Sequence, residues 1–287
     1  MRRLLLLAIS SLAIGTAQAQ TYLSPDPPPY SVADRFRLEV DLFRGSYNTQ
    51  IRLDNSVTTA AGVTTVTPGT QVFAENDLGL AKSQYLGQLE LTLLPGKHHM
   101  VRLSGLSMRR EGEQILTRTI QWGNSNYQLN DRVSSHLNLN MVGLTYGYLP
   151  FRSDRFELGL SFGIQIASVS ANAEVRSRAL RGEESAVGPI PLLGLETRYD
   201  FTRHWSVDGR MQYLSLGLIG SAGADLSGVK GTITDYRVAL RWRQNQHFIY
   251  GLGYRQFKVE VDSPTSNPAG LVSIALSGPL LFMQASL

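Results

Sequence analysis

Residues 156–167 read FELGLSFGIQIA, and large apolar residues alternate in them with polar or small ones. Successive side chains of a β-strand point to opposite faces, so a period of two indicates a strand with one apolar face. The stretch therefore predicts a β-strand whose even-numbered positions form that apolar face.

The same period recurs along the rest of the chain. Ten stretches show it: 36–42, 88–93, 101–104, 136–141, 156–167, 195–201, 205–211, 235–242, 248–254 and 281–287. The predicted fold is all-β, a transmembrane antiparallel β-barrel of about ten strands. Eight or twelve strands are the alternatives, because 114–122 and 127–133 read either as strands or as a hairpin above the membrane.

The connections between these stretches alternate in length. Those at 95–97, 150–154, 202–204 and 243–247 are short, whereas those near 47–84, 111–133, 168–190, 214–230 and 262–271 are long. Outer-membrane barrels have short periplasmic turns and long extracellular loops, and this pattern favours one. Residues 55–70 read as an extracellular hairpin extension or a mobile loop.

Aromatic residues cluster beside the short connections. They are Phe151, Phe156, Tyr199, Phe201, Trp205, Trp242 and Phe248. Aromatic girdles mark the two interfaces of a membrane barrel. We therefore expect a periplasmic girdle here, with Tyr47, Tyr213 and Tyr236 contributing to an outer one.

The N-terminus has the pattern of an export signal. Arg2 and Arg3 precede the apolar stretch 4–14, and Ala17-Gln18-Ala19 fits a cleavage site. We assign 1–19 to a signal peptide, 20–33 to a Pro-rich periplasmic linker with no fold of its own, and 34–287 to the barrel.

Composition excludes several classes of protein. The 287 residues are 43% hydrophobic and include no Cys, so disulfides and thiolate chemistry are excluded. With 27 basic and 23 acidic residues, the charge argues against a nucleic-acid partner. Past the N-terminus, no apolar run reaches the roughly 20 residues of a membrane-spanning helix.

Taken together, these features resemble Gram-negative outer-membrane β-barrel proteins, without identifying a subfamily. Residues 277–287, SGPLLFMQASL, look like the C-terminal strand that the barrel-assembly machinery recognises, although such chains usually end in Phe and this one ends in Leu287. The resemblance implies the cell outer membrane as location, its lipid as surroundings and the assembly machinery as a partner during biogenesis. The oligomeric state is left open.

The faces opposite the apolar ones carry both signs of charge and are expected to line the lumen. The residues are Arg37, Glu39, Asp41, Glu90, Arg102, Glu157, Glu196, Arg198, Asp208, Arg210, Asp235, Arg237, Arg241 and Arg255. Buried charges must be paired or hydrated. The leading interpretation is a plugged or narrow polar lumen in a protein with an envelope structural or surface-contact role. The alternative is a narrow, porin-like diffusion channel for small polar solutes.

A third interpretation is an outer-membrane lipid hydrolase. Ser134 and His136 lie two residues apart, so they share a strand face, and a Ser–His pair can act as nucleophile and base. That face also carries Asn138 and Asn140 and is predicted to be lumenal, which disfavours a site acting on lipid. No GxSxG element is present. No catalytic residue is therefore assigned, and neither a cofactor nor a metal is expected.

Arginines near the long connections suggest a contact with lipopolysaccharide. Arg176, Arg178 and Arg181 are the candidates, with Arg109 and Arg110 nearby in the outer half. Guanidinium groups bind phosphate by charge-assisted hydrogen bonds, and lipopolysaccharide is rich in phosphate.

Overall fold

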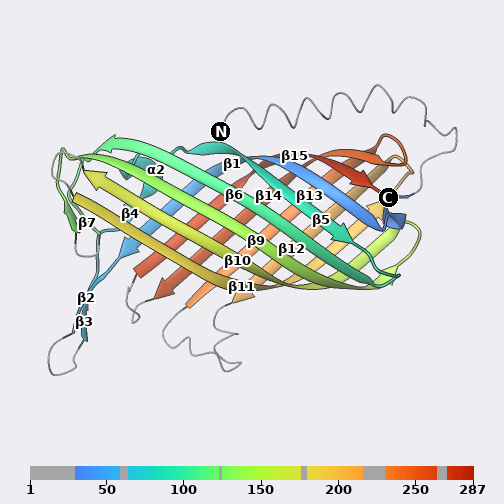
Figure 1. The fold of residues 1–287 in the computed structure, drawn as a ribbon, viewed down its shortest axis with the longest axis horizontal. Helices are drawn as coiled ribbons and strands as arrows, with labels where there is room; N and C mark the ends of the chain where they lie inside the picture. Colours follow the sequence, from blue (N-terminus) through green and yellow to red (C-terminus); the bar gives the residue numbers. More distant parts are fainter. Residues whose placement is uncertain (1–29, 59–63, 123–124, 176–179, 216–229, 264–269) are drawn as a thin grey trace.

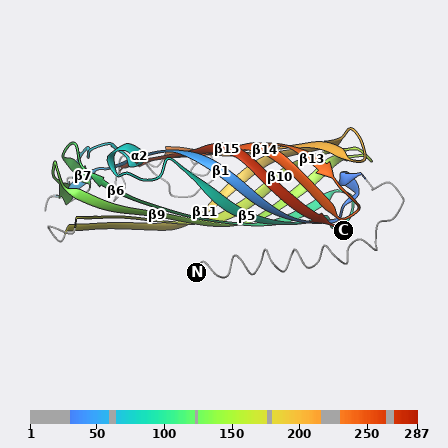
Figure 2. The same ribbon diagram turned by 90° about the horizontal axis from the view of Figure 1, so that it is seen from above.

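The structure is a computed structural model that describes residues 30–58, 64–122, 125–175, 180–215, 230–263 and 270–287. The barrel strands are β1 (Phe36–Leu53), β5 (Ser83–Leu93), β6 (His99–Ile115), β9 (Arg132–Arg152), β10 (Phe156–Val175), β11 (Leu180–Asp200), β12 (Trp205–Ser215), β13 (Lys230–Arg243), β14 (Phe248–Ser263) and β15 (Gly270–Ser286). Each pairs antiparallel with its neighbours, and β1 pairs with β15 to close the sheet (Figures 1 and 2). The predicted ten-stranded barrel is confirmed.

The remaining elements are short and lie at the two ends. They are η2 (Ser31–Ala33), β2 (Asn55–Thr58), β3 (Thr64–Thr67), β4 (Val72–Phe73), α2 (Ala74–Asp77), β7 (Ile120–Trp122) and β8 (Ser125–Tyr127). The β2–β3 and β7–β8 pairs are separate two-stranded sheets, so 114–133 adds a hairpin and no barrel strand. Within the described ranges, no helix is both long and apolar enough to cross a bilayer.

The two ends of the barrel differ as the connection lengths predict. The C-terminus, η2 and the short turns lie at one end, whereas α2, β7 and the β2–β3 hairpin lie at the other (Figure 1). By the rule for outer-membrane barrels, the short-turn end faces the periplasm. The signal peptide predicted at 1–19 and linker residues 20–29 lie outside the described residues.

The end of the predicted linker is part of the barrel, contrary to the expectation that 20–33 has no fold. Ser31 and Val32 are buried, and both hydrogen-bond the Asp200 carboxylate, Ser31 Oγ at 2.5 Å and Val32 N at 3.1 Å. The Arg152 guanidinium donates to Val32 O at 2.5 Å. The sequence did not predict this turn, because the Pro-rich stretch continues up to Tyr30, directly before η2.

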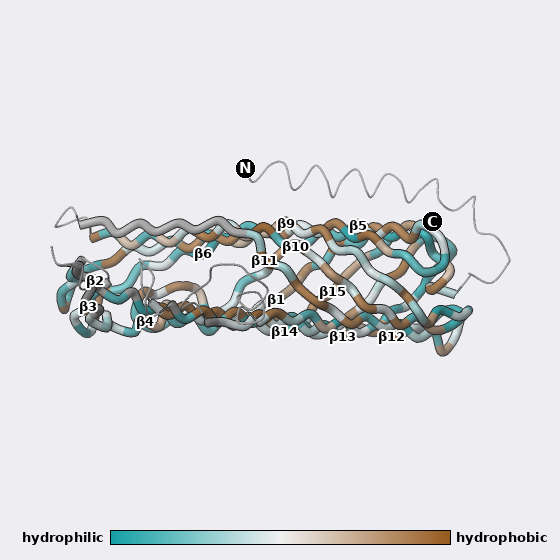
Figure 3. The backbone as a smooth tube through the Cα atoms, turned by 90° about the horizontal axis from the view of Figure 1, so that it is seen from below, coloured by the Kyte–Doolittle hydropathy of each residue, from teal (hydrophilic) through white to brown (hydrophobic). Residues whose placement is uncertain are grey.

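The exterior changes polarity along each strand, as β10 shows. Leu158, Leu160, Phe162, Ile164 and Ile166 point outward over nine residues, close to the 9–11 that a strand needs to cross a bilayer. Beyond them the outward residues of the same strand are Ser168, Ser170, Asn172 and Glu174. The strands therefore continue past the apolar band into water, and brown and teal segments alternate along them (Figure 3).

The interior changes in the opposite sense. At the level of the apolar band, the interior holds charged side chains. Beyond the band, toward the end with the long connections, it holds a buried apolar cluster that includes Phe43, Tyr47, Leu137, Leu192 and Phe257. We call the part of the barrel beyond the apolar band the outer half; like a water-soluble protein, it has an apolar interior and a polar exterior. The part within the band, the inner half, has the apolar exterior and polar interior of a membrane barrel. The long connections predicted near 111–133 and 168–190 therefore overlap strands of the structure, because β6 runs to Ile115, β10 runs to Val175 and β11 begins at Leu180.

Candidate functional site

All fourteen predicted lumen residues point into the barrel. Seven are arginines and seven are carboxylates, and most are buried. They come from β1, β5, β6 and β10–β14, so the site draws on nearly the whole circumference. Strand periodicity places them: each strand contributes every second residue, and the residues between them form the apolar exterior.

Glu90 is the node of the charge network. Its carboxylate accepts from Arg210 Nη1 at 2.9 Å and Arg210 Nη2 at 3.1 Å, and from Arg237 Nη1 at 3.1 Å. Arg102 Nε lies 3.3 Å from Glu90 Oε2. In the strand order, four strands separate β5 from β12 in either direction, so the Glu90–Arg210 pair crosses the full diameter.

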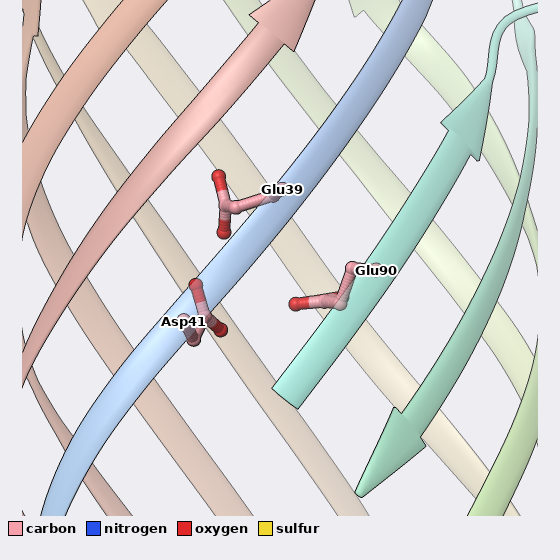
Figure 4. Close-up of side chains that lie close together, drawn as sticks. All are labelled: Glu39, Asp41 and Glu90. Carbon is pink, nitrogen blue, oxygen red and sulfur yellow. The ribbon is translucent and has the colours of Figure 1, made fainter. Parts of the chain in front are cut away.

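Three of the carboxylates lie close together, as Figure 4 shows for Glu39, Asp41 and Glu90. One oxygen from each lies within 4.8 Å of the others, a spacing that could suit a cation. Arg237 supplies that cation from the chain itself, because its guanidinium donates to Glu39 at 2.5 Å, Asp41 at 3.3 Å and Glu90 at 3.1 Å. The arrangement is therefore an ion cluster internal to the protein, in which Arg237 already binds one oxygen of each carboxylate.

Further ion pairs extend the network along the barrel. Arg241 bridges Glu39 at 2.7 Å and Asp208 at 2.6 Å, and the faces of both Arg237 and Arg241 lie on the Phe282 ring. Other pairs are Arg37–Glu157 at 3.3 Å, Arg102–Glu196 at 2.5 Å and Arg255–Asp235 at 2.6 Å. Almost every formal charge thus meets an opposite one, as burial requires.

The sequence reading missed one member of this network. Arg243 continues the inward face of Arg237 and Arg241, and its guanidinium pairs with the buried Asp34 carboxylate. Arg243 could have been predicted from strand periodicity, because it lies two residues after Arg241 and so shares its inward face. Asp34 could not be found this way, because it lies just before β1 and has no strand periodicity.

Little space remains among these side chains. The cavity lined by Glu90, Arg210, Arg241 and their neighbours measures about 40 Å³. A cavity needs about 10–15 Å³ of such space to hold one water, so this one has room for about three or four. The lumen at this level is filled by paired charges.

Above the charges, a short inserted segment fills the barrel. Four residues of this segment are buried in the apolar cluster: Ala74, which begins α2, and Val72, Leu78 and Leu80 on either side of that helix. We call residues 72–80 the plug. It lies beside β6, whose pairing with β5 stops at Gln88–Leu106 although β6 continues to Ile115.

Arg110 holds the plug in place. It is 1% exposed, and it donates to Glu75 Oε1 at 2.8 Å and Thr49 Oγ1 at 3.0 Å, with its face over the Tyr47 ring. Glu75 also accepts from Thr49 N at 3.0 Å. Arg110, expected near a lipid-contacting rim, is therefore an interior residue. Arg109 points outward and pairs with Glu111 at 2.7 Å.

Ser134 and His136 face outward, contrary to the lumenal face predicted for them. On β9 the inward residues are Val133, Ser135, Leu137 and Leu139, so the polar residues between them meet water. The prediction failed because it placed apolar residues on the outside, whereas this part of β9 lies above the apolar band. His136 lies opposite Glu111 on β6, but no hydrogen bond connects Ser134 to His136.

The predicted lipopolysaccharide arginines are mostly outside the described part of the chain. Arg176 and Arg178 lie there entirely. The backbone of Arg181 pairs with Glu174 in the β10–β11 ladder. Among described residues, Arg44 lies directly above the outward Leu42, at the edge of the apolar band, with its guanidinium 5.9 Å from the Tyr85 ring centroid.

An apolar exterior over a charged interior decides the class of the molecule. A closed barrel of even strand number, with a lipid-compatible band outside, short turns at one end and paired charges inside, satisfies every backbone group within a bilayer. The protein is an outer-membrane β-barrel. Its outer half projects beyond the membrane.

Comparisons with known proteins identify no subfamily. No family model matches the sequence, and no curated protein sequence matches it. Similar solved structures include outer membrane protease OmpT of Escherichia coli, at 12% identity and TM-score 0.48, covering 92% of this chain and 100% of that one. Ail, the attachment invasion locus protein of Yersinia pestis, shows 8% identity, coverage of 88% and 98%, and TM-score 0.35. The Pseudomonas putida toluene transporter TodX shows 8% identity, coverage of 88% of this chain and 90% of that one, and a TM-score of 0.34.

Proposed function

We propose that this barrel is a closed, non-conducting protein of the outer membrane that acts through its projecting outer half in surface contact. The observation that carries the proposal is the Glu90–Arg210 ion pair, which joins diametrically opposed strands in the middle of the lumen. A diffusion channel needs a continuous aqueous path. Here paired charges fill the membrane level, and an apolar cluster with the plug fills the level above.

The projecting half supports a contact role because it gives the protein a large polar exterior. Outward residues of β6, β9 and β10 at this level include Glu111, Asn138 and Asn172, and three strands of 17–21 residues carry them. A barrel that served only as a membrane anchor could stop at the bilayer surface. The extra length instead builds a rigid surface above the lipid.

Lipopolysaccharide is the first partner that we propose for this surface. Arg44 points outward at the boundary between the apolar band and the polar exterior, which is where lipid phosphates lie. Its guanidinium lies 5.9 Å from the Tyr85 ring centroid, and the Arg44 side chain is exposed. Arg176, Arg178 and Arg181 remain candidates on the sequence argument. Replacing Arg44 with Gln should reduce lipopolysaccharide retained through detergent extraction, and unchanged retention would count against this contact.

Conductance in a planar bilayer tests the closed lumen. We expect the purified barrel to be silent, with folding verified by its faster migration in unboiled gel samples. Stepwise, reproducible conductance from folded protein would overturn the proposal and make the lumen charges a selectivity lining. The lipid hydrolase interpretation receives no support from the geometry of Ser134 and His136 and is not proposed.

A further inference from the structure

Arg198 differs from the other arginines of the lumen, because each of those pairs with a carboxylate of the chain. Arg198 points inward from β11 and is 9% exposed. It forms no hydrogen bond or ion pair with any described residue, and its Nε and Nη1 atoms are buried without a partner there. A buried charge is costly unless it is paired and hydrogen-bonded. This guanidinium therefore needs a counter-charge that the described chain does not supply.

The carboxylates beside Arg198 on the two neighbouring strands are already engaged. In the ladders, Arg198 lies opposite Glu157 of β10 and Asp208 of β12. Strand neighbours on one face are close enough to pair. Glu157 instead accepts from Arg37 at 3.3 Å, and Asp208 accepts from Arg241 at 2.6 Å. Both carboxylates thus bind arginines of other strands.

The carboxylates two residues away along β11 are engaged as well. Glu196 accepts from Arg102 Nη1 at 2.8 Å. Asp200 accepts from Ser31 Oγ at 2.5 Å. The carboxylates on every side of Arg198 are therefore bound to other donors.

Arg198 also lines the lumen cavity of about 40 Å³. Two more arginines of its wall, Arg37 and Arg241, each have a buried Nε without a partner in the described chain. Both cations act electrostatically on Arg198 more strongly than the neighbouring carboxylates Glu157 and Asp208 do. The cavity thus combines N–H donors with positive charge around Arg198, and it has room for about three or four waters.

We propose that this cavity binds a small monovalent anion of the chloride class, which neutralises Arg198. Guanidinium N–H groups bind anions by charge-assisted hydrogen bonds. A chloride ion is only slightly larger than a water molecule, so the cavity admits it, whereas a lipid headgroup or a peptide is too large. Arg37 and Glu157 are the second residues of β1 and β10, so the site lies near the end of the barrel with the short turns.

Thermal unfolding of the barrel, purified from membranes in neutral detergent, tests the proposal with chloride as the probe. Potassium chloride replaces potassium gluconate at constant ionic strength, because gluconate is too bulky for the cavity. We expect the unfolding midpoint to rise saturably, by about 2–4 °C once chloride is several-fold above its dissociation constant. A midpoint that does not depend on chloride would overturn the proposal.

Arg198→Gln should fold in gluconate with the yield of the parent, because the loss of Arg198 deprives no carboxylate of a hydrogen bond. The variant should also lose the rise that chloride gives the parent. An undiminished rise in the folded variant would overturn the proposal. Failure of the variant to fold in gluconate would show that the chain itself compensates Arg198, and that result would overturn the proposal too.

Arg109→Gln is the control variant, because it removes the same charge from the exposed, outward face of β6. We expect it to keep the full chloride-dependent rise. Loss of the rise in both variants would show that chloride acts on the barrel as a whole, against the proposal. Conductance is a separate readout, so a conducting barrel would leave this result standing.

Discussion

Glu90 on β5 and Arg210 on β12 meet in the centre of the barrel, although their strands stand on opposite sides of it. Two hydrogen bonds of 2.9 and 3.1 Å join them. A bidentate pair fixes distance and direction together. The pair therefore spans the lumen and closes it at this level.

Removing the carboxylate of Glu90 should destabilise the barrel strongly. Glu90→Gln leaves Arg102, Arg210 and Arg237 sharing fewer negative charges in a buried site. Breaking a buried pair typically costs about 3–5 kcal/mol. Urea unfolding of the barrel in detergent should show a loss of this order, and an unchanged midpoint would show that the network is hydrated and weak.

Glu260→Gln is the matched control for Glu90→Gln. Glu260 pairs with Lys258 at 2.8 Å, but both side chains are more than 40% exposed. Exposed pairs contribute about 0–1 kcal/mol. The two glutamates therefore separate the effect of burial from that of charge.

The Arg110–Glu75 pair should hold the plug inside the barrel. Glu75→Gln weakens a buried charge-assisted hydrogen bond and leaves Arg110 uncompensated, at a cost of about 3 kcal/mol. Because the plug is one short segment, we expect it to detach locally rather than unfold the barrel. Limited proteolysis should then cleave the variant within 72–80 and spare the parent. Equal protection of both proteins from the protease would show that the Arg110–Glu75 pair does not hold the plug in place.

Gly251 should tolerate no side chain, because Phe282 occupies the space beside it. A Cβ at this position would lie 2.1 Å from Phe282 Cζ and 2.6 Å from the Leu240 carbonyl oxygen. Gly251→Leu should therefore sharply lower the yield of folded, heat-modifiable barrel. Gly105→Ala is the control, since nothing lies within 4 Å of its Cβ position. A folded Gly251→Leu barrel would show that Phe282 can leave the lumen.

The sequence predicted the fold and the charged face, and it failed where the surroundings of a strand change. Leu158 and Glu157 follow the expected rule, with the apolar residue facing lipid. Leu137 and His136 have the same alternation but the opposite orientation, because they lie above the band. Periodicity gives the two faces of a strand but does not say which solvent each face meets.

The pairing of the lumen charges was also beyond sequence reasoning. Glu90 and Arg210 are 120 residues apart, and their contact follows from the closure of ten strands. Alternation places both residues on inward faces. The alternation contains no information on the register between neighbouring strands, which places Glu90 and Arg210 at the same level along the barrel axis.

Replacing Ser134 with Ala should leave the lipid A of the cell unchanged. A serine nucleophile needs a base within hydrogen-bond reach, at about 2.6–3.2 Å, and no hydrogen bond joins Ser134 to His136. His136 lies opposite Glu111, whose carboxylate is engaged by Arg109 at 2.7 Å and is more than half exposed. Mass spectra of lipid A from cells expressing the parent, Ser134→Ala or no barrel should be identical. A species present only with the parent would restore the hydrolase, with its site on the outward face of β9 rather than in the lumen.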